Sequence, residues 1–149
     1  EVDEGRTLMT LSAADFIIQL CAHLYKEATV INWVEMGRDL SLYKFSDLYL
    51  LFADGLDDET AEQIALRAVE YGLQKECTYA LRYTKELYGI ENPILEHLLE
   101  MILPADLSFM KRILRPSDNH VFQYDMPFID WMFCHKRKEM LYETGYAAT

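Results

Sequence analysis

Two short pairs of cysteine and histidine are the first residues whose types suggest chemistry: Cys21-x-His23 and Cys134-His135. Thiolate and imidazole are ligands that Zn²⁺ prefers. On a helix, however, side chains two positions apart point about 200° apart, and adjacent ones about 100° apart. Neither pair can therefore hold one ion from a single helix, and we predict no metal site and no bound cofactor.

The cysteines could also serve as nucleophiles, which requires a thiol of low pKa beside an imidazole. Cys21, Cys77 and Cys134 instead lie on or beside the apolar stripes of predicted helices, where cysteine packs as a small hydrophobic residue. We therefore predict no catalytic cysteine. One alternative stays open, a small hydrolase or transferase subunit, which would need Cys134, His135 or His120 beside a carboxylate in a cleft.

The paired carboxylates have ordinary structural explanations. Asp57 and Asp58 are typical of a helix start, and Glu96 and Glu100 lie one helical turn apart on a side predicted to face solvent. The glycine patterns of phosphate-binding and dinucleotide-binding loops are absent from the sequence. We therefore assign no catalytic residue and predict that the protein is not an enzyme.

Aromatic and basic side chains are the candidates for binding a partner. The chain has ten Tyr, seven Phe and two Trp, and Tyr and Trp are enriched among the residues that dominate binding at protein interfaces. Most of these rings should fill the core, and the remainder should form a contact surface. The basic residues at 111–115 and 136–138 either dock an acidic partner or are solvated side chains at helix C-termini, where the helix dipole favours positive charge. The predicted partner-binding residues are Tyr79, Tyr83, Phe122, Tyr124, Trp131, Lys136, Arg137 and Lys138.

Composition limits the class of partner and the compartment. The 149 residues carry a net charge of −11, which repels phosphate backbones and anionic membrane surfaces. No apolar run approaches the ~18 residues that cross a bilayer, and three widely spaced cysteines do not resemble a disulfide framework. We therefore predict an intracellular protein, cytoplasmic or nuclear, that binds another protein. Nucleic acid and membrane are not expected as partners, and self-association is left open.

Helical periodicity and capping residues predict about eight short helices, which must position these side chains. Asn92-Pro93 is a strong helix start, and Gly72 and Gly89 are strong stops. The predicted fold class is all-α, with helical hairpins stacked into a bundle or a short solenoid. Residues 1–149 should form one domain, excised from a longer chain, with residues 1–11 frayed. The predicted helices cover about residues 12–27, 32–42, 46–53, 57–72, 74–88, 92–103, 106–114 and 125–142.

Three similar turn sequences suggest repeated helical hairpins. The best is Cys77–Leu103, in which two helices are joined by a Tyr88-Gly89-Ile90 turn. Fainter versions place turns at Tyr43-Lys44-Phe45, within a hairpin over Asn32–Leu56, and at Tyr71-Gly72-Leu73. Stacks of such hairpins mostly bind other proteins.

Motifs in the C-terminal half follow an order found in one known family. They are the Cys77–Tyr83 helix with its turn at 88–90, Ile113–Asp118, and Asp125 followed by Phe128, Ile129 and Trp131. In this order, residues 77–138 resemble the BACK domain of BTB/Kelch-type and germ-cell-less-type adaptors. The resemblance implies an all-helical part of a ubiquitin-ligase substrate adaptor. We therefore interpret the chain as a non-enzymatic protein–protein interaction module, an adaptor or scaffold.

Two other functions stay open beside this interpretation. A Bcl-2-like regulator would hold an amphipathic helix in a groove, and it would need a central apolar hairpin wrapped by the other helices. The second is the small enzyme with a Cys/His site described above. A structure distinguishes the two, because it places the hairpins and the histidines.

Overall fold

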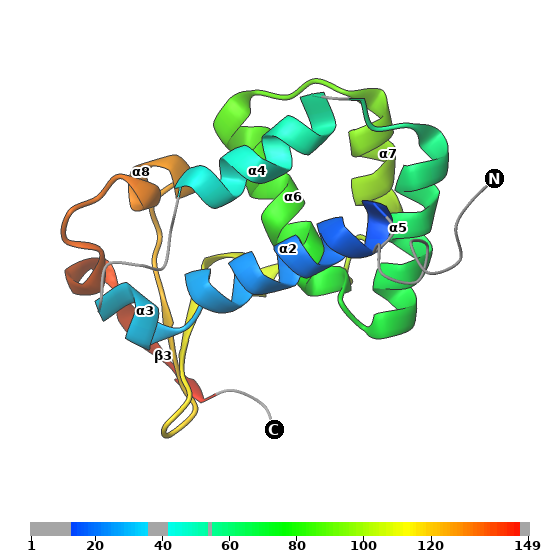
Figure 1. Ribbon diagram of the computed structural model, residues 1–149. Coiled ribbons are helices and arrows are strands. Elements are labelled where there is room, and N and C mark those ends of the chain that lie inside the picture. The colour runs from blue at the N-terminus through cyan, green and yellow to red at the C-terminus, as the bar shows by residue number, and fades with distance from the viewer. Residues whose placement is uncertain (1–12, 36–41, 54, 147–149) are drawn as a thin grey trace, which may run out of the picture.

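The computed structural model describes residues 13–35, 42–53 and 55–146. The long helices gather at one end of the molecule, and a small three-stranded sheet with short helical turns lies at the other (Figure 1). The long helices are α2 (Ala13–Ala28), α4 (Leu42–Ala53), α5 (Asp58–Tyr71), α6 (Gln74–Tyr88) and α7 (Pro93–Met101). The shorter elements are α3 (Ile31–Glu35), the 3₁₀ turn η1 (Ser108–Lys111), β1 (Arg112–Arg115), β2 (His120–Gln123), α8 (Phe128–Met132), the 3₁₀ turn η2 (Arg137–Met140) and β3 (Tyr142–Tyr146). The described residues are thus mostly helical, but they are not all-α.

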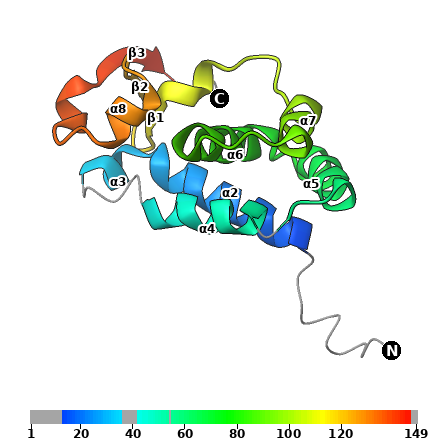
Figure 2. The same cartoon turned by 90° about the horizontal axis from the view of Figure 1, so that it is seen from above.

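Helices α2 and α6 form the centre of the helical part. They pack against each other, α4 contacts both, and α5 contacts α2, α6 and α7. The view from above shows α2, α4 and α6 side by side, with α5 and α7 at one end (Figure 2). One face of α2 buries Ile17, Ile18, Cys21 and Leu24, which is the spacing of an amphipathic helix packed on a core. In the described ranges, no helix is long and apolar enough to cross a bilayer.

Local capping signals position α5, α6 and α7 as predicted. The Asp57 carboxylate accepts a hydrogen bond from the backbone N–H three residues on, at 2.7 Å. Gly72 ends α5 and Gly89 ends α6 in the left-handed conformation, at φ 69° and 59°, which glycine adopts without strain. Asn92 caps α7. The hairpin over Cys77–Leu103 is therefore confirmed.

The turn predicted at Tyr43-Lys44-Phe45, within the hairpin over Asn32–Leu56, is wrong. Helix α4 begins at Leu42, so Tyr43-Lys44-Phe45 lie in its first turn and do not form a loop between helices. Phe45, Leu48 and Phe52 are all buried. Their spacing of three and four residues makes one apolar stripe that continues through the expected turn, and burial of this stripe favours an unbroken helix.

The other predictions in the first third have mixed outcomes. The helix predicted over 12–27 is confirmed as α2, within one residue at each end. The helix predicted over 32–42 is described only as the short α3, and residues 36–41 lie outside the described ranges. The fraying predicted for residues 1–11 also falls outside them.

The C-terminal third differs most from prediction. A helix predicted over 106–114 is replaced by η1 and strand β1, and the segment after it contains β2. β1 and β2 pair antiparallel, with Arg115 opposite His120. Asn119 takes a left-handed φ of 59° in the connecting turn, and Arg115 forms an ion pair with Asp118 there. Asn is one of the few residues that tolerate this conformation, so the turn favours a hairpin of strands.

The long helix predicted over 125–142 is wrong as well. Helix α8 covers only five residues of it, and η2 follows. The chain then forms β3, which pairs antiparallel with β2. The Tyr and Thr residues of Tyr142–Tyr146 favour strands. Their pairing partner, β2, is distant in sequence, so no local pattern predicts the pairing.

Hydrogen bonds and ring contacts join the sheet to the helices. The N–H of Leu114 in β1 donates to the carbonyl of Thr29, just beyond the end of α2, at 2.7 Å. The Phe128 ring of α8 stacks on Tyr83 of α6 with centroids 3.6 Å apart. One hydrophobic core therefore includes residues from both ends of the molecule.

Candidate functional site

A cavity of about 420 Å³ lies where α2, α6 and β1 meet. Three of its lining residues are cationic, one is a carboxylate, and Tyr25 supplies an aromatic ring. We call this cavity the basic pocket. Its positive character is unusual in a chain whose net charge is −11. It is lined by Ala22, Tyr25, Lys26, Thr29, Val30, Lys75, Glu76, Arg112, Leu114 and Val121.

Each cation of the basic pocket comes from a different element. Lys26 lies in the last turn of α2, Lys75 in the first turn of α6, and Arg112 is the first residue of β1. The packing of α2 against α6 brings the two lysines to the same region. The hydrogen bond from Leu114 to Thr29 holds β1 beside the end of α2.

None of the three cations has a carboxylate within 4 Å among the residues that the structure describes. The Nζ of Lys75 lies 5.8 Å from the ring centroid of Tyr25 and 6.0 Å from that of Phe109, which are cation–π distances. The Arg112 guanidinium donates a hydrogen bond to the hydroxyl of Ser108. The positive charge at this cavity is therefore available to an anion.

Tyr25 contributes a neutral hydroxyl to the basic pocket. Burial raises the pKa of Tyr25 to about 12, the Glu76 carboxylate adds to the rise, and Arg112 opposes it. At neutral pH the hydroxyl is therefore protonated and adds no negative charge. The ring contacts Tyr79 edge-on, with centroids 5.1 Å apart, which fixes its orientation. The pocket thus combines three cations with a polar group, an arrangement that can bind a multiply charged anion.

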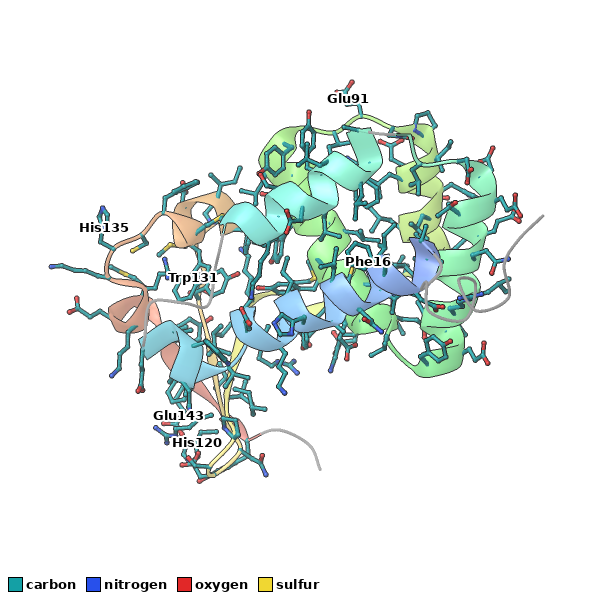
Figure 3. All side chains as sticks on the ribbon, viewed as in Figure 1. Phe16, Glu91, His120, Trp131, His135 and Glu143 are labelled. Carbon is teal, nitrogen blue, oxygen red and sulfur yellow. The ribbon has the colours of Figure 1, made fainter. Side chains whose placement is uncertain are left out.

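The predicted aromatic contact residues lie mostly in the core. Four of them are 4% exposed or less: Tyr79, Tyr83, Tyr124 and Trp131. Trp131 of α8 stacks on Tyr124 with centroids 4.1 Å apart and is labelled in Figure 3. Phe122 is half-buried, with the Arg115 guanidinium 5.2 Å from its ring centroid. The structure therefore places these rings in packing positions, and their role in partner binding stays a prediction.

The predicted basic contact residues serve local structure on the loop after α8. Arg137 is half-buried and donates hydrogen bonds to the carbonyls of Met132 and Cys134. Lys136 and Lys138 are exposed, and Lys138 lies 3.6 Å from Glu35 of α3. The structure does not bring this loop together with the basic pocket, and a partner for it stays a prediction.

Two of the three cysteines lie in the core. Cys21 and Cys77 are fully buried. A hydrogen bond with Cys77, together with burial, raises the pKa of the Cys21 thiol well above its ordinary value, whereas a nucleophilic thiol needs a lowered pKa. In the described ranges, no group of three or more His, Cys, Asp or Glu side chains could hold a metal ion.

His120 has a carboxylate on each side. Its Nδ1 contacts Glu143 of β3, and its Nε2 lies 3.5 Å from Asp118. Figure 3 shows His120 and Glu143 together at the sheet end, with His135 on a separate loop. This group meets one condition of the small-enzyme alternative, a histidine beside a carboxylate, but it does not line the basic pocket.

The residues of the basic pocket are not grouped by any pattern in the sequence. Lys26 and Lys75 lie on separate helices, and Arg112 was assigned to a basic cluster that was expected to end a helix or to dock a partner. One signal was present: neither lysine has an acidic residue three or four positions away, so neither can form an ion pair along its own helix. That signal alone does not reveal which cations converge.

Comparison with known proteins gives one match. The model of a family described as "uncharacterised nucleotidyltransferase" matches residues 1–89. This segment includes α2 to α6 and most of the residues that line the basic pocket. No curated protein and no solved structure matches the chain.

The family match corrects several predictions. The resemblance of residues 77–138 to the BACK domain is wrong, and so is the interpretation of the chain as a non-enzymatic adaptor or scaffold. The Bcl-2-like alternative is not supported either, and the match favours the alternative of a small enzyme. Because the matched residues make up more than half of the 149, the protein belongs to this family of nucleotidyltransferases.

Proposed function

We propose that this protein acts in nucleotidyl transfer, with the basic pocket as a binding site for the phosphates of a nucleoside triphosphate. In such a reaction an acceptor atom attacks the α-phosphorus, the bond from that phosphorus to the β-phosphate oxygen breaks, and pyrophosphate leaves. The observation that carries the proposal is the family match over residues 1–89. The basic pocket supports it, because most of its lining lies in the matched segment.

The residues of the basic pocket suit this chemistry. A nucleoside triphosphate carries several negative charges, and charge moves onto the leaving pyrophosphate during the reaction. Lys26, Lys75 and Arg112 would offset that charge, and positioned cations stabilise such a transition state. The neutral Tyr25 hydroxyl would donate a further hydrogen bond.

Reactions of this class commonly use Mg²⁺ held by carboxylates, which neutralises phosphate charge when it is bound. Among the described residues, no three His, Cys, Asp or Glu side chains converge on one point. The proposal therefore concerns what the chain's own cations do: they bind and orient the phosphates.

Helices α5, α6 and α7 have a structural role in this proposal. Their successive hairpins would act as a rigid support for the α6 end of the pocket. A nucleoside triphosphate substrate agrees with the intracellular location predicted from the sequence, since these compounds are made and used inside cells.

Transfer of a labelled nucleotide tests the proposal. The protein is incubated with each of four nucleoside triphosphates labelled at the α-phosphate, together with a cell extract as the source of acceptors, and label in the acceptor fraction is counted. We expect transfer with at least one nucleotide, and a loss of about tenfold or more in Lys75→Ala because one charge-assisted contact is removed. Lys136→Ala, which removes an exposed lysine outside the pocket, should transfer like the unmodified protein. Absence of transfer with all four nucleotides would contradict the proposal.

A further inference from the structure

We infer that the basic pocket recognises a diphosphate group specifically, so that it binds free pyrophosphate as well as the terminal phosphates of a nucleoside triphosphate, and does not bind the base. The role of this site in a reaction rests on the proposed function. The binding itself rests on the geometry alone.

In the part of the chain that the structure describes, the three cations of the basic pocket lack carboxylate partners. Several other basic side chains of this acidic chain have one: Lys44 with Glu27, Arg67 with Asp15, Lys85 with Glu96 and Arg115 with Asp118. Lys26, Lys75 and Arg112 have none within the described residues, although acids outnumber bases by 25 to 14 in the chain. Cations left unpaired around one cavity are a site for an external anion.

The three charges of the basic pocket come from separate elements. Lys26 of α2, Lys75 of α6 and Arg112 of β1 all line the cavity of about 420 Å³. One phosphate group presents its charge at a single point, whereas two linked phosphates present charge over a greater length. A diphosphate can therefore contact all three cations at once, and the additional contacts favour it over inorganic phosphate.

The aromatic rings near the cavity are already engaged with protein groups. Tyr25 makes T-shaped contacts with Tyr79 and Phe109, at centroid distances of 5.1 and 6.4 Å, and the Lys75 ammonium lies over the Tyr25 ring. A nucleobase would need a free aromatic face for stacking, so the nucleoside part of the ligand must extend out of the pocket.

Arg112 adds a specific expectation about the C-terminal sheet. It belongs to β1, beyond the residues that match the family, yet its charge acts on Tyr25. The hydrogen bond of Leu114 to Thr29 keeps β1 in place. The sheet is therefore part of the anion site, to which it contributes Arg112.

Isothermal titration of the whole protein with pyrophosphate, phosphate, ATP and AMP tests this inference. Pyrophosphate and ATP should bind and compete with each other. Phosphate and AMP should bind at least about tenfold more weakly than pyrophosphate. Lys75→Ala and Arg112→Ala should each weaken pyrophosphate binding by about tenfold, and Lys75→Arg should restore it because the charge returns. The control is Lys111→Ala, which removes the neighbour of Arg112 that contacts the Asp125 carbonyl outside the pocket. Circular dichroism verifies that each variant is folded.

The outcomes separate the inference from the proposed function. If pyrophosphate does not bind, or binds equally to the Lys75→Ala, Arg112→Ala and Lys111→Ala variants, the inference is wrong even where nucleotide transfer is observed. If pyrophosphate binds as described and no nucleotide is transferred, the inference holds and the proposed function fails. Equal affinity for AMP and pyrophosphate would also overturn the inference, because the base or ribose would then be part of what the pocket recognises.

Discussion

Asp118 is an exposed carboxylate whose pKa is lowered to about 2. The main cause is the hydrogen bonding of the Arg115 guanidinium, whose Nε and Nη2 lie 2.9 and 2.8 Å from the two carboxylate oxygens. The backbone N–H of His120 donates a further hydrogen bond at 3.2 Å. This arrangement stabilises the charged form of Asp118 in the folded hairpin. The Nε2 of His120 lies 3.5 Å from the same carboxylate.

We predict that Arg115→Ala raises the pKa of Asp118 towards the ordinary value of about 3.9. A pKa lowered in the folded state adds stability above the ordinary value, and that stability is lost as the pH falls towards 2. The β1–β2 hairpin should therefore lose stability as the pH falls towards 2, and the variant, in which the folded and unfolded pKa values of Asp118 are alike, should lose this pH dependence. An NMR titration of the side-chain carboxyl carbon measures this pKa directly. Arg115→Lys, which keeps the charge but not the two parallel hydrogen bonds, should give an intermediate value, and an unchanged pKa in Arg115→Ala would contradict the assignment.

At this scale the sequence predicted residues that act locally and missed those that act across the fold. The roles of Asp57, Gly72, Gly89 and Asn92 follow from hydrogen bonds and dihedral angles within a few positions. The convergence of Lys75 with distant cations depends on helix packing, which no residue type reveals by itself.

Among the helices, α7 depends most clearly on its cap. The Asn92 side chain accepts hydrogen bonds from the N–H groups of Ile94 and Leu95, at 2.9 and 3.4 Å. Asn92→Ala should lower the free energy of unfolding by about 1 kcal/mol, because two helix-end donors lose their partner. Urea denaturation followed by circular dichroism measures the change.

Two variants make the test of this cap specific. Asn92→Ser keeps a hydroxyl acceptor and should cost much less. Glu91→Ala alters an exposed neighbour without touching the cap, and it should be close to neutral. If Asn92→Ala unfolds at the same urea concentration as the unmodified protein, the cap makes no net contribution.

The elements divide into those that local signals specify and those that distant contacts specify. The α5–α6–α7 segment has a capping residue or a terminal glycine at nearly every boundary, and its predicted bounds agree with the structure. Residues 112–115, in contrast, overlap the end of the helix predicted over 106–114 but form a strand. They do so because β2 pairs with them and Leu114 bonds to Thr29. The resemblance to a BACK domain failed for the same reason, since most of its motifs lie in this mispredicted region.

On the scale of the whole molecule, Phe128 connects the two ends. It is 1% exposed, stacks on Tyr83 of α6, and meets Phe45 of α4 edge-on at 5.8 Å. The α8 region therefore completes the core beneath the first helices of the chain. The same packing holds β1, with Arg112, at the basic pocket, so the anion site depends on a core built from both halves of the sequence.

We therefore predict that the helical part and the sheet unfold in one step. In a Trp33→Phe background, fluorescence reports Trp131, a fully buried residue of α8, while far-ultraviolet circular dichroism reports mainly the helices. The two urea transitions should coincide, as expected of one cooperative unit. Phe128→Ala should lower the stability by about 3 to 5 kcal/mol and shift both transitions together, whereas Phe128→Leu, which keeps most of the buried volume, should cost much less. A fluorescence transition that precedes the loss of helix would mean that α8 and the sheet open separately, and the basic pocket would then lose Arg112 while α2 and α6 remain folded.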